Sequence, residues 1–374
     1  MRIVITHPFC WPHVRRGSER QIEIIAGWLG TQGHQVTYLS THPEGERREE
    51  MSYGQRVLAK PVRGFAPLRI DERHTFLWTT LSRLGAMNAQ IVHSFYFMDS
   101  LAASLARSRN RYRTVLQLHG LAIPGVSCRR ILPPEGLMLG QALRRADAVV
   151  TCSGFVARQM EAVYGVKPKV VHSPVQLESW PLGDGPADGR PAVLSVGDFT
   201  VRRKGARPLV AAFVRLLEEC PEAVLRLSGR IGGELEQELR DLAGQRAARS
   251  IEFLGLGAPE ELFRHYQQAS VLAMPSMAEP SGTAMMEALA SGTPVVAVRH
   301  GGLPEYLDAG TSILVDPGEN DEELDNVAGL AEGLLRGIQM SREQGIRRRC
   351  RQHAEKFSVQ ALGAGYEELY ATLQ

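Results

Sequence analysis

The sequence predicts an α/β protein built from two doubly wound domains. Short apolar strands alternate with amphipathic helices through both halves of the chain, which is typical of parallel sheets covered by helices on both faces. The length of 374 residues exceeds the size at which one hydrophobic core stops growing. Residues 180–192 are rich in Gly, Pro and Asp and interrupt the periodicity, so we expect an exposed linker between the domains there.

In the first half, apolar segments bounded by polar residues mark the strands. An amphipathic helix is expected from about residue 18 to residue 32, directly after the first strand. Residues 41–75 are rich in charge and proline, do not follow the alternation and are expected to form an irregular excursion. The predicted strands are residues 2–6, 35–40, 91–95, 114–119, 148–153 and 169–173.

The second half repeats the alternation and predicts a second α/β unit. Its predicted strands are residues 192–197, 224–229, 251–255, 271–276, 294–298 and 312–316. Helices are expected at residues 206–219, 233–244, 259–269, 282–291, 321–337 and 341–356. Since doubly wound sheets bind ligands at the carboxyl ends of their strands, the site is expected in the loops that follow strands.

Composition narrows the class of protein. The five cysteines are scattered, without a Cys-x-x-Cys pair or a Cys/His cluster at zinc spacing, so we expect a reducing cytoplasm and no structural metal. Neither a signal peptide nor an apolar run of about 18 residues is present, which predicts a soluble or peripheral protein. The first 180 residues carry 23 Lys or Arg and 13 Asp or Glu, so the first half is basic and the second acidic.

The segment EPSGTAMMEALASGTPVVA, residues 279–297, places two carboxylates eight residues apart around a helix start. Ser281, Gly282 and Thr283 begin the helix, and free backbone N–H groups there suit a phosphate. A carboxylate beside a phosphate repels it, so Glu279 and Glu287 are expected to bind hydroxyl groups. Solvated surface glutamates are the alternative, but the apolar neighbours of Glu287 make an unpartnered charge there costly.

Residues 279–307, EPSGTAMMEALASGTPVVAVRHGGLPEYL, resemble the Glu-x7-Glu signature of the retaining, nucleotide-sugar-dependent glycosyltransferases of family 4. The resemblance implies the GT-B fold, two facing Rossmann-like domains with the ligand cleft between them. Residues 1–178 would form the acceptor-side domain and residues 179–357 the nucleotide-sugar domain. The last helix, in residues 358–374, would cross back onto the first domain or close the second.

The loop after the first strand corresponds to the glycine-rich acceptor loop of the family. Gly17 matches this loop, whereas Arg16 stands where relatives have their first Gly. Arg16, Gly17 and Ser18 are therefore candidates for acceptor contacts. A plain helix start capped by Ser18 is the alternative.

Residues 196–210, VGDFTVRRKGARPLV, resemble the loop with which relatives hold the donor diphosphate through an Arg and a Lys. Lys204 matches the Lys. Asp198 stands at the Arg position, and Arg202 or Arg203 is expected to substitute. Because a helix start disfavours cations, these side chains indicate an anionic ligand, with a surface charge cluster as the alternative.

Two histidines end strands of the first domain. By resemblance, His119 lies near the anomeric carbon and is the acceptor-side catalytic candidate; a structural strand-end histidine is the alternative. His93 is expected to be structural. Gly301 and Gly302 would cap the nucleotide side of the cleft, or form a turn only.

These features predict a retaining glycosyltransferase that uses a nucleoside diphosphate sugar and needs neither a metal nor another cofactor. Glu279, Lys204 and His119 are the catalytic candidates, with Glu287 on the ribose and Arg203 assisting Lys204. A nucleotide-sugar epimerase and a non-catalytic nucleotide-sugar binding protein are the alternatives. No dehydrogenase fingerprint or nucleic-acid motif is present.

The acceptor is expected to be a carbohydrate, a lipid-linked molecule or a natural product, in cell-envelope or secondary-metabolite biosynthesis. Arginines at alternating positions in RSRNRYR, residues 107–113, and Arg15 beside the acceptor loop suggest peripheral contact with an anionic membrane. A soluble acceptor explains the basic first half equally well.

Overall fold

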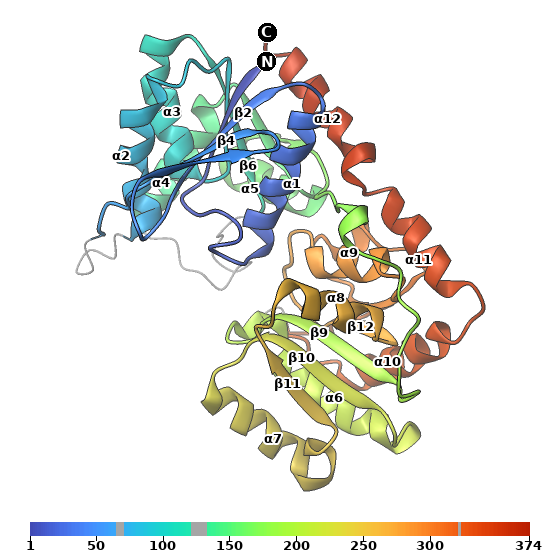
Figure 1. Cartoon of the computed structure of the whole chain (residues 1–374). Helices are drawn as coiled ribbons and strands as arrows, with labels where there is room; N and C mark the ends of the chain where they lie inside the picture. The colour runs from blue at the N-terminus through green and yellow to red at the C-terminus, as the bar shows by residue number, and fades with distance from the viewer. Residues whose placement is uncertain (65–70, 121–132, 321–322) are drawn as a thin grey trace. The chain divides into compact units, whose positions relative to one another are not determined.

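The computed structural model covers the chain and describes all residues except 65–70, 121–132 and 321–322, together with the side chains of 108–110 and 133–134 (Figure 1). It divides into two compact units. Unit 1 comprises the described residues up to Pro174 together with Val359–Gln374, and unit 2 comprises Val175–Ser358.

Unit 1 is built on a sheet of eight strands in the order β3-β4-β2-β1-β5-β6-β7-β8. Neighbouring strands run parallel except for β3 and β4, which are antiparallel. The order reverses direction between β1 and β5, so the loops after these two strands flank the topological switch point. The strands are β1 (Arg2–Thr6), β2 (Gln35–Thr41), β3 (Arg47–Met51), β4 (Gly54–Ala59), β5 (Ile91–Ser94), β6 (Arg113–Leu118), β7 (Ala148–Thr151) and β8 (Lys169–Val170).

Helices cover both faces of this sheet, as a doubly wound fold requires. The final helix, α12, packs against α1, where a Cβ added to Gly363 would lie 2.2 Å from the Trp28 ring. The other face carries α2, α3 and α4, in which α2 contacts α3 and α3 contacts α4. The helices are α1 (Gly17–Thr31), α2 (Glu72–Leu84), α3 (Phe97–Asn110), α4 (Pro133–Arg145), α5 (Gly154–Tyr164) and α12 (Val359–Ala371).

The expectation of an irregular excursion over residues 41–75 is wrong for much of that segment. It contains β3 and β4, which extend the sheet beyond β2. The sequence of β3 is RREEM and its side chains alternate between half-buried and exposed, so it lacks the apolar face by which strands are recognised. An edge strand pairs on one side only and commonly carries charge, which also limits aggregation.

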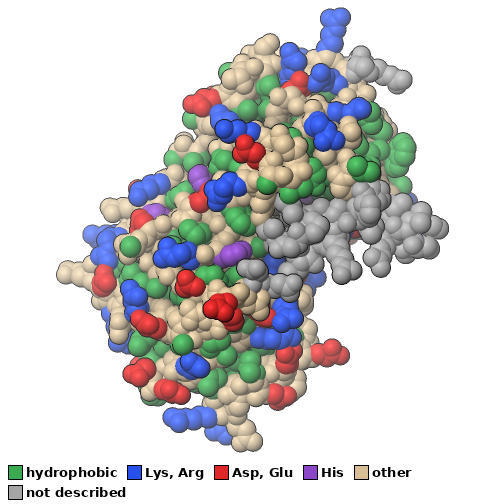
Figure 2. Space-filling view, turned by 180° about the vertical axis from the view of Figure 1, so that it is seen from behind, with side chains coloured by type: hydrophobic (Ala, Val, Ile, Leu, Met, Phe, Trp, Pro, Cys, Tyr) green, Lys and Arg blue, Asp and Glu red, His purple; other side chains and the backbone are tan. Residues whose placement is uncertain are grey.

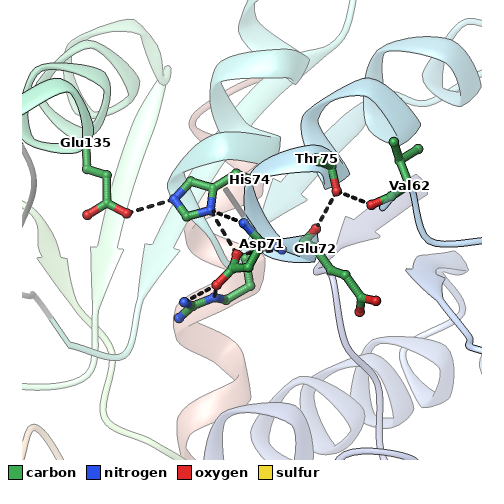
Figure 3. Close-up of polar contacts among 7 residues, drawn as sticks. Val62, Asp71, Glu72, His74, Thr75 and Glu135 are labelled. Atoms are coloured by element: carbon green, nitrogen blue, oxygen red, sulfur yellow. Dashed lines mark hydrogen bonds and ion pairs between the residues drawn. The ribbon is translucent and has the colours of Figure 1, made fainter. Parts of the chain in front are cut away.

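A histidine connects α2 with α4 (Figure 3). Nδ1 of His74 lies 2.8 Å from Oδ1 of Asp71, the N-cap of α2, and Nε2 lies 2.7 Å from Oε1 of Glu135 in the first turn of α4. The backbone N–H of Arg73 also donates to Asp71. Carboxylates at helix N-termini complement the helix dipoles, and the imidazole joins two such carboxylates, so these contacts fasten two helix starts to each other.

Unit 2 contains a fully parallel sheet of six strands in the order β11-β10-β9-β12-β13-β14. This is the strand order of a Rossmann fold, with its topological switch point between β9 and β12. The prediction of Rossmann-like doubly wound architecture is therefore confirmed in each unit. The strands are β9 (Ala192–Asp198), β10 (Val224–Arg230), β11 (Ile251–Gly255), β12 (Val271–Met274), β13 (Val295–Val298) and β14 (Ser312–Val315).

Two apolar cores lie on opposite faces of the second sheet. One contains residues of α6, α7 and α10, and the other contains residues of α8, α9 and α11. Trp180, within the expected linker of residues 180–192, is buried against Tyr266 and Phe263 of α8, so the start of that segment packs on unit 2. The helices are α6 (Ala206–Glu219), α7 (Gly233–Ala248), α8 (Pro259–Gln267), α9 (Thr283–Ala290), α10 (Val327–Ser341) and α11 (Ile346–Glu355).

The last two predicted helices of unit 2 begin later than expected. The helix predicted for residues 321–337 is α10 at Val327–Ser341, with Asn326 as its N-cap; residues 321–322 lie outside the described residues. The Asn326 side chain accepts a hydrogen bond from the N–H of Gly329, which fixes that start. Within the described ranges, no helix is long and apolar enough to cross a membrane.

Candidate active site

The candidate donor site lies at the switch point of unit 2, where the loops after β9 and β12 meet. The N–H of Met277 donates to the carbonyl of Arg203 over 2.9 Å, joining the two loops through their backbones. Gly205, which ends the 3₁₀ turn η3 (Arg202–Lys204), has φ +71, and a Cβ there would lie 2.5 Å from the carbonyl oxygen of Pro275. Only glycine permits both this conformation and this close approach.

Glu279 binds two cations that come from the other loop. Nη1 of Arg203 donates to Oε1 of Glu279 over 3.1 Å, and Nζ of Lys204 donates to the same oxygen. Burial would raise the pKa of the Glu279 carboxyl, but the two cations offset it and hold the pKa below its ordinary value. Glu279 is 6% exposed, whereas the Arg203 and Lys204 side chains are 23% and 22% exposed. The buried carboxylate therefore anchors two cationic side chains that remain partly accessible to solvent.

The loop after β13 supports Glu279 from its other side. The N–H of Gly302 donates to the carbonyl of Glu279 over 2.7 Å, and the N–H of Ala278 donates to Nδ1 of His300 over 2.8 Å. Gly301 has φ +68, and a Cβ there would lie 2.5 Å from the Glu279 carbonyl oxygen. Loops from three adjacent strands thus position this one residue, and the Gly301-Gly302 pair supports the Glu279 backbone.

The start of α9 follows Glu279 directly. Ser281 is buried, and Gly282 is the N-cap with φ +69, packed so closely that a Cβ would lie 2.6 Å from a Leu303 methyl group. Thr283 is the first helical residue. The first backbone N–H groups of a helix have no intrahelical acceptor, so this turn suits an anion.

Glu287 is buried in the second turn of α9 and accepts a hydrogen bond from the hydroxyl of Tyr266 over 2.9 Å. Tyr266 belongs to α8 and is fully buried against Trp180. Glu287 is therefore not the solvated surface glutamate that the sequence left open as an alternative. A carboxylate has lone pairs for several donors, and the tyrosine satisfies one of them while it fixes the side chain.

Asp198 and Arg202 of the β9 loop do not join the ion cluster. Asp198 accepts hydrogen bonds from the N–H and the hydroxyl of Thr200 and so closes the turn after β9. Arg202 pairs with Glu323 over 2.7 Å and is largely exposed. Arg203, by contrast, joins Lys204 at Glu279, so it is the arginine that occupies the candidate site.

In unit 1, the loop after β1 ends at the start of α1. Arg16 is the N-cap in extended conformation, without a side-chain capping bond, and its guanidinium lies 5.5 Å from the centre of the Phe9 ring. Gly17 is the first helical residue. Ser18 is therefore inside the helix and not its cap, and its hydroxyl donates to the buried carboxylate of Glu19 over 2.7 Å.

His119 follows β6 at the carboxyl edge of the sheet. Its ring is half-buried and stacks on Phe95 at a centroid distance of 5.6 Å. Desolvation lowers its pKa to about 4, with a smaller effect of His7, so the imidazole is neutral near pH 7. Among the described residues, its buried Nε2 has no hydrogen-bond partner. The ring can therefore offer either an N–H or a lone pair to a ligand.

His93 has a structural environment. Its Nδ1 lies 2.7 Å from the hydroxyl of Tyr370 in α12, and its ring also stacks on Phe95, with a centroid distance of 4.4 Å. Burial lowers its pKa to about 3. His93 thus connects β5 with the final helix, in agreement with its expected role.

The structure brings together Arg203, Lys204 and Glu279 in one ion cluster next to Ser281–Thr283. Arg16–Ser18 and His119 belong to the other unit. Sequence reasoning missed Tyr266 and His300. Tyr266 lies in an ordinary amphipathic helix 21 residues before Glu287, and no local pattern marks such a partner.

Two sequence-family models match the chain. A model described as "Glycosyltransferase Family 4" matches residues 15–179, and one described as "Glycosyl transferases group 1" matches residues 190–335. A D-inositol 3-phosphate glycosyltransferase of Corynebacterium urealyticum is 35% identical over 365 residues, covering 89% of this chain and 85% of that protein. A protein of the same name from Corynebacterium jeikeium is 37% identical over 180 residues, which cover only 46% of this chain and 41% of the relative.

Solved structures match the whole chain at lower identity. The sucrose-phosphate synthase of Thermosynechococcus elongatus has a TM-score of 0.81 at 20% identity, with coverage of 100% of this chain and 98% of that one. The Anabaena protein HepE, solved in complex with UDP, has a TM-score of 0.76 at 17% identity and full coverage of both chains. Likeness at this level shows the fold, and it confirms the predicted GT-B fold class.

Proposed function

Because the chain belongs to the family 4 glycosyltransferases, we propose that it transfers a sugar from a nucleoside diphosphate sugar to an acceptor hydroxyl with retention of anomeric configuration. The observation that carries the proposal is the ion cluster at the switch point of unit 2. Two cations from the β9 loop converge there on one buried carboxylate, and the start of α9 follows that residue closely in the chain.

The leaving diphosphate develops negative charge as the glycosidic bond breaks. Lys204, Arg203 and the backbone N–H groups at Ser281–Thr283 supply positive charge and hydrogen bonds for it, which is electrostatic stabilisation of the transition state. The Gly205 and Gly282 turns fix the backbone that carries these groups. This set makes a divalent metal unnecessary in the proposed mechanism.

Carboxylates of the site bind hydroxyl groups in the proposal. Glu279 takes the hydroxyls of the transferred sugar, and Glu287, held by Tyr266, takes the ribose hydroxyls. The neutral imidazole of His119 is the proposed acceptor-side catalytic group. Its buried Nε2 is consistent with a ligand contact rather than a purely structural role.

The names of the relatives suggest which acceptor to test first. The matching proteins from Corynebacterium are D-inositol 3-phosphate glycosyltransferases, so we propose a phosphorylated polyol of this kind as the acceptor class. HepE was solved with UDP, which places UDP sugars first among the donors to test. ADP, GDP and dTDP sugars complete the panel.

Incubation of the purified protein with each donor, with and without D-inositol 3-phosphate, tests the proposal. We expect release of the nucleoside diphosphate to depend on the acceptor, and proton NMR of the product should show the anomeric configuration of the donor. Conversion of the donor sugar without an acceptor would instead indicate an epimerase. Binding without any turnover over the whole panel would indicate a non-catalytic protein, and an inverted product would refute retention.

We propose in addition that the protein is cytoplasmic and that unit 1 contacts an anionic membrane surface. Arg107 and Arg113 both pair with Asp147, which neutralises part of the charge of that segment. Arg111 is exposed, and the side chain of Arg109 lies outside the described residues. On the face drawn in Figure 2, basic and acidic side chains are intermixed. Sedimentation with anionic vesicles at low salt, reversed by high salt and weakened by Arg111→Gln, would support the contact; equal behaviour with neutral vesicles would refute it.

A further inference from the structure

Three basic side chains meet at the carboxyl edge of the unit 1 sheet. His13 lies in the loop after β1, His42 directly follows β2, and Arg47 begins β3. Nε2 of His42 lies 3.2 Å from Nδ1 of His13, and the two rings have a centroid distance of 4.2 Å. Nη2 of Arg47 lies 3.3 Å from Nε2 of each histidine.

No placement of the imidazole protons of His13 and His42 gives every nitrogen–nitrogen contact of this cluster one donor and one acceptor. The N–H of Glu44 points at Nδ1 of His42 over 3.2 Å, so that nitrogen is an acceptor and the proton of neutral His42 is on Nε2. This Nε2–H faces Nδ1 of His13 as well as Nη2 of Arg47. If Nδ1 of His13 accepts it, the proton of neutral His13 is on Nε2 and faces Nη2 of Arg47, which is only a donor. If the proton of His13 is on Nδ1 instead, it faces Nε2–H of His42. The other tautomer of His42 turns an N–H toward the N–H of Glu44 instead. Every neutral assignment therefore leaves two donors facing each other without an acceptor between them.

Among the described residues, no carboxylate supplies the missing acceptor at this point. Glu49 lies 2.9 Å from Nε of Arg47, and Glu44 lies 3.5 Å from Nη1, so both carboxylates approach the other nitrogens of the guanidinium. Glu49 also binds the buried Arg56. Nη2 is the nitrogen turned toward the imidazoles, and a bound cation is disfavoured there by the guanidinium charge.

Burial and position separate this cluster from an ordinary surface group. His42 is only 6% exposed, while His13 is exposed, so the donors are anchored on one side and accessible on the other. Desolvation, His42 and Arg47 together lower the pKa of His13, which keeps it neutral until an anion approaches. His13 and the acceptor candidates Arg16–Ser18 belong to the same stretch between β1 and the first turn of α1.

We infer that His13, His42 and Arg47 form a subsite for a phosphate-type anion, and that this anion is the charged group of the acceptor. The donors that face one another would then converge on acceptor-only oxygens, in charge-assisted hydrogen bonds. The subsite is a property of unit 1 alone, whereas its assignment to the acceptor rests on the proposed glycosyl transfer.

Histidine NMR of the full-length protein, titrated with inorganic phosphate at constant ionic strength, tests the subsite without any sugar transfer. We expect saturable shifts of the His13 and His42 imidazole signals, a rise in the pKa of His13 and no such change with chloride. Arg47→Gln should weaken phosphate binding about tenfold or more, because one charge-assisted hydrogen bond contributes that much. Arg48→Gln, which alters the neighbouring exposed arginine of β3, is the control and should change binding less than about twofold. His13→Gln offers a second variant at an exposed position.

Shifts that do not saturate, that chloride reproduces, or that persist in Arg47→Gln would overturn the subsite. Displacement of phosphate by glycerol 3-phosphate would indicate a soluble phosphorylated acceptor, and displacement by phosphatidylglycerol vesicles a lipid-linked one. Displacement by neither would overturn the assignment to an acceptor. If phosphate binds as expected but no donor in the panel supports transfer, the subsite stands and the proposed function fails.

Discussion

Replacement of Glu279 by Gln should strengthen the binding of the free nucleoside diphosphate. In the unliganded protein, the carboxylate neutralises part of the charge of Lys204 and Arg203, the cations proposed to bind the diphosphate. A diphosphate must therefore compete with Glu279 for these two side chains. The glutamine keeps the shape of the side chain and removes the competing charge.

The magnitude follows from the geometry. Two unit charges separated by the 3.1 Å between Arg203 Nη1 and Glu279 Oε1 interact by about 5 kcal/mol at an effective dielectric constant of about 20, an upper limit before solvent competes. Hydrogen bonds to charged groups contribute about 1.5–3 kcal/mol net. We therefore expect diphosphate affinity to rise about tenfold to a hundredfold. The complete sugar nucleotide should gain less, because it loses the Glu279 contact with its hydroxyls, and turnover should fall.

Isothermal titration calorimetry with the tightest-binding member of UDP, GDP, ADP and dTDP, and with its sugar nucleotide, measures both effects. Glu252→Gln is the matched control, since Glu252 pairs with Arg226 over 2.8 Å in the same unit, away from the β9 and β12 loops. Its diphosphate affinity should equal that of the wild type. Equal or weaker diphosphate binding by a folded Glu279→Gln variant would refute the reasoning, because Lys204 and Arg203 would then not receive the diphosphate.

The remaining predictions concern the other members of the site and the buried histidines. Lys204→Ala should lower the turnover number more than it raises the Michaelis constant, because its charge acts as the diphosphate leaves; steady-state kinetics showing an effect on the Michaelis constant alone would contradict this. Glu287→Ala should weaken donor binding by about 1–3 kcal/mol in calorimetry, with Tyr266→Phe intermediate, whereas unchanged affinity would make the pair purely structural. Activity should survive EDTA, and loss that magnesium or manganese restores would refute metal independence. The pKa values of about 3 for His93 and about 4 for His119 lie below the ordinary 6.5, so the unfolded chain takes up protons first as the pH falls. Their contribution to stability is present above about pH 6.5 and is lost toward pH 4, by about 2 kcal/mol per histidine at about pH 5. Chemical denaturation should show a weaker pH dependence for His93→Asn, and an unchanged one would place the effect elsewhere.

Local sequence patterns were sufficient for the fold class and for most elements. Strand segments such as residues 192–197 and 271–276 are apolar because both faces of a parallel sheet are covered, and this signal needs no knowledge of the partner strand. The segment β3 escaped the same reasoning. The charged side chains of β3 suit the exposed edge of a sheet, and they carry no apolar alternation. Only its pairing with β4 identifies RREEM as a strand.

The sequence by itself determined the candidate donor residues, because Glu279, Ser281–Thr283 and Glu287 lie within nine consecutive residues and Lys204 directly precedes a glycine turn. What only the tertiary structure decided is which side chains meet across long separations. Arg203 rather than Arg202 joins Lys204, since backbone pairing with Met277 sets the direction of the turn.

The same limit applies to the contacts of Tyr266 with Glu287 and of Arg47 with His13 and His42, which are separated by 21, 34 and 5 residues. Spacing along a helix or strand fixes which residues share a face, because backbone geometry repeats. It carries no information about which loops converge, since that depends on strand order and on the packing of whole elements. Strand order placed the β9 and β12 loops side by side, and it placed His42 of the β2 edge beside the loop that follows β1.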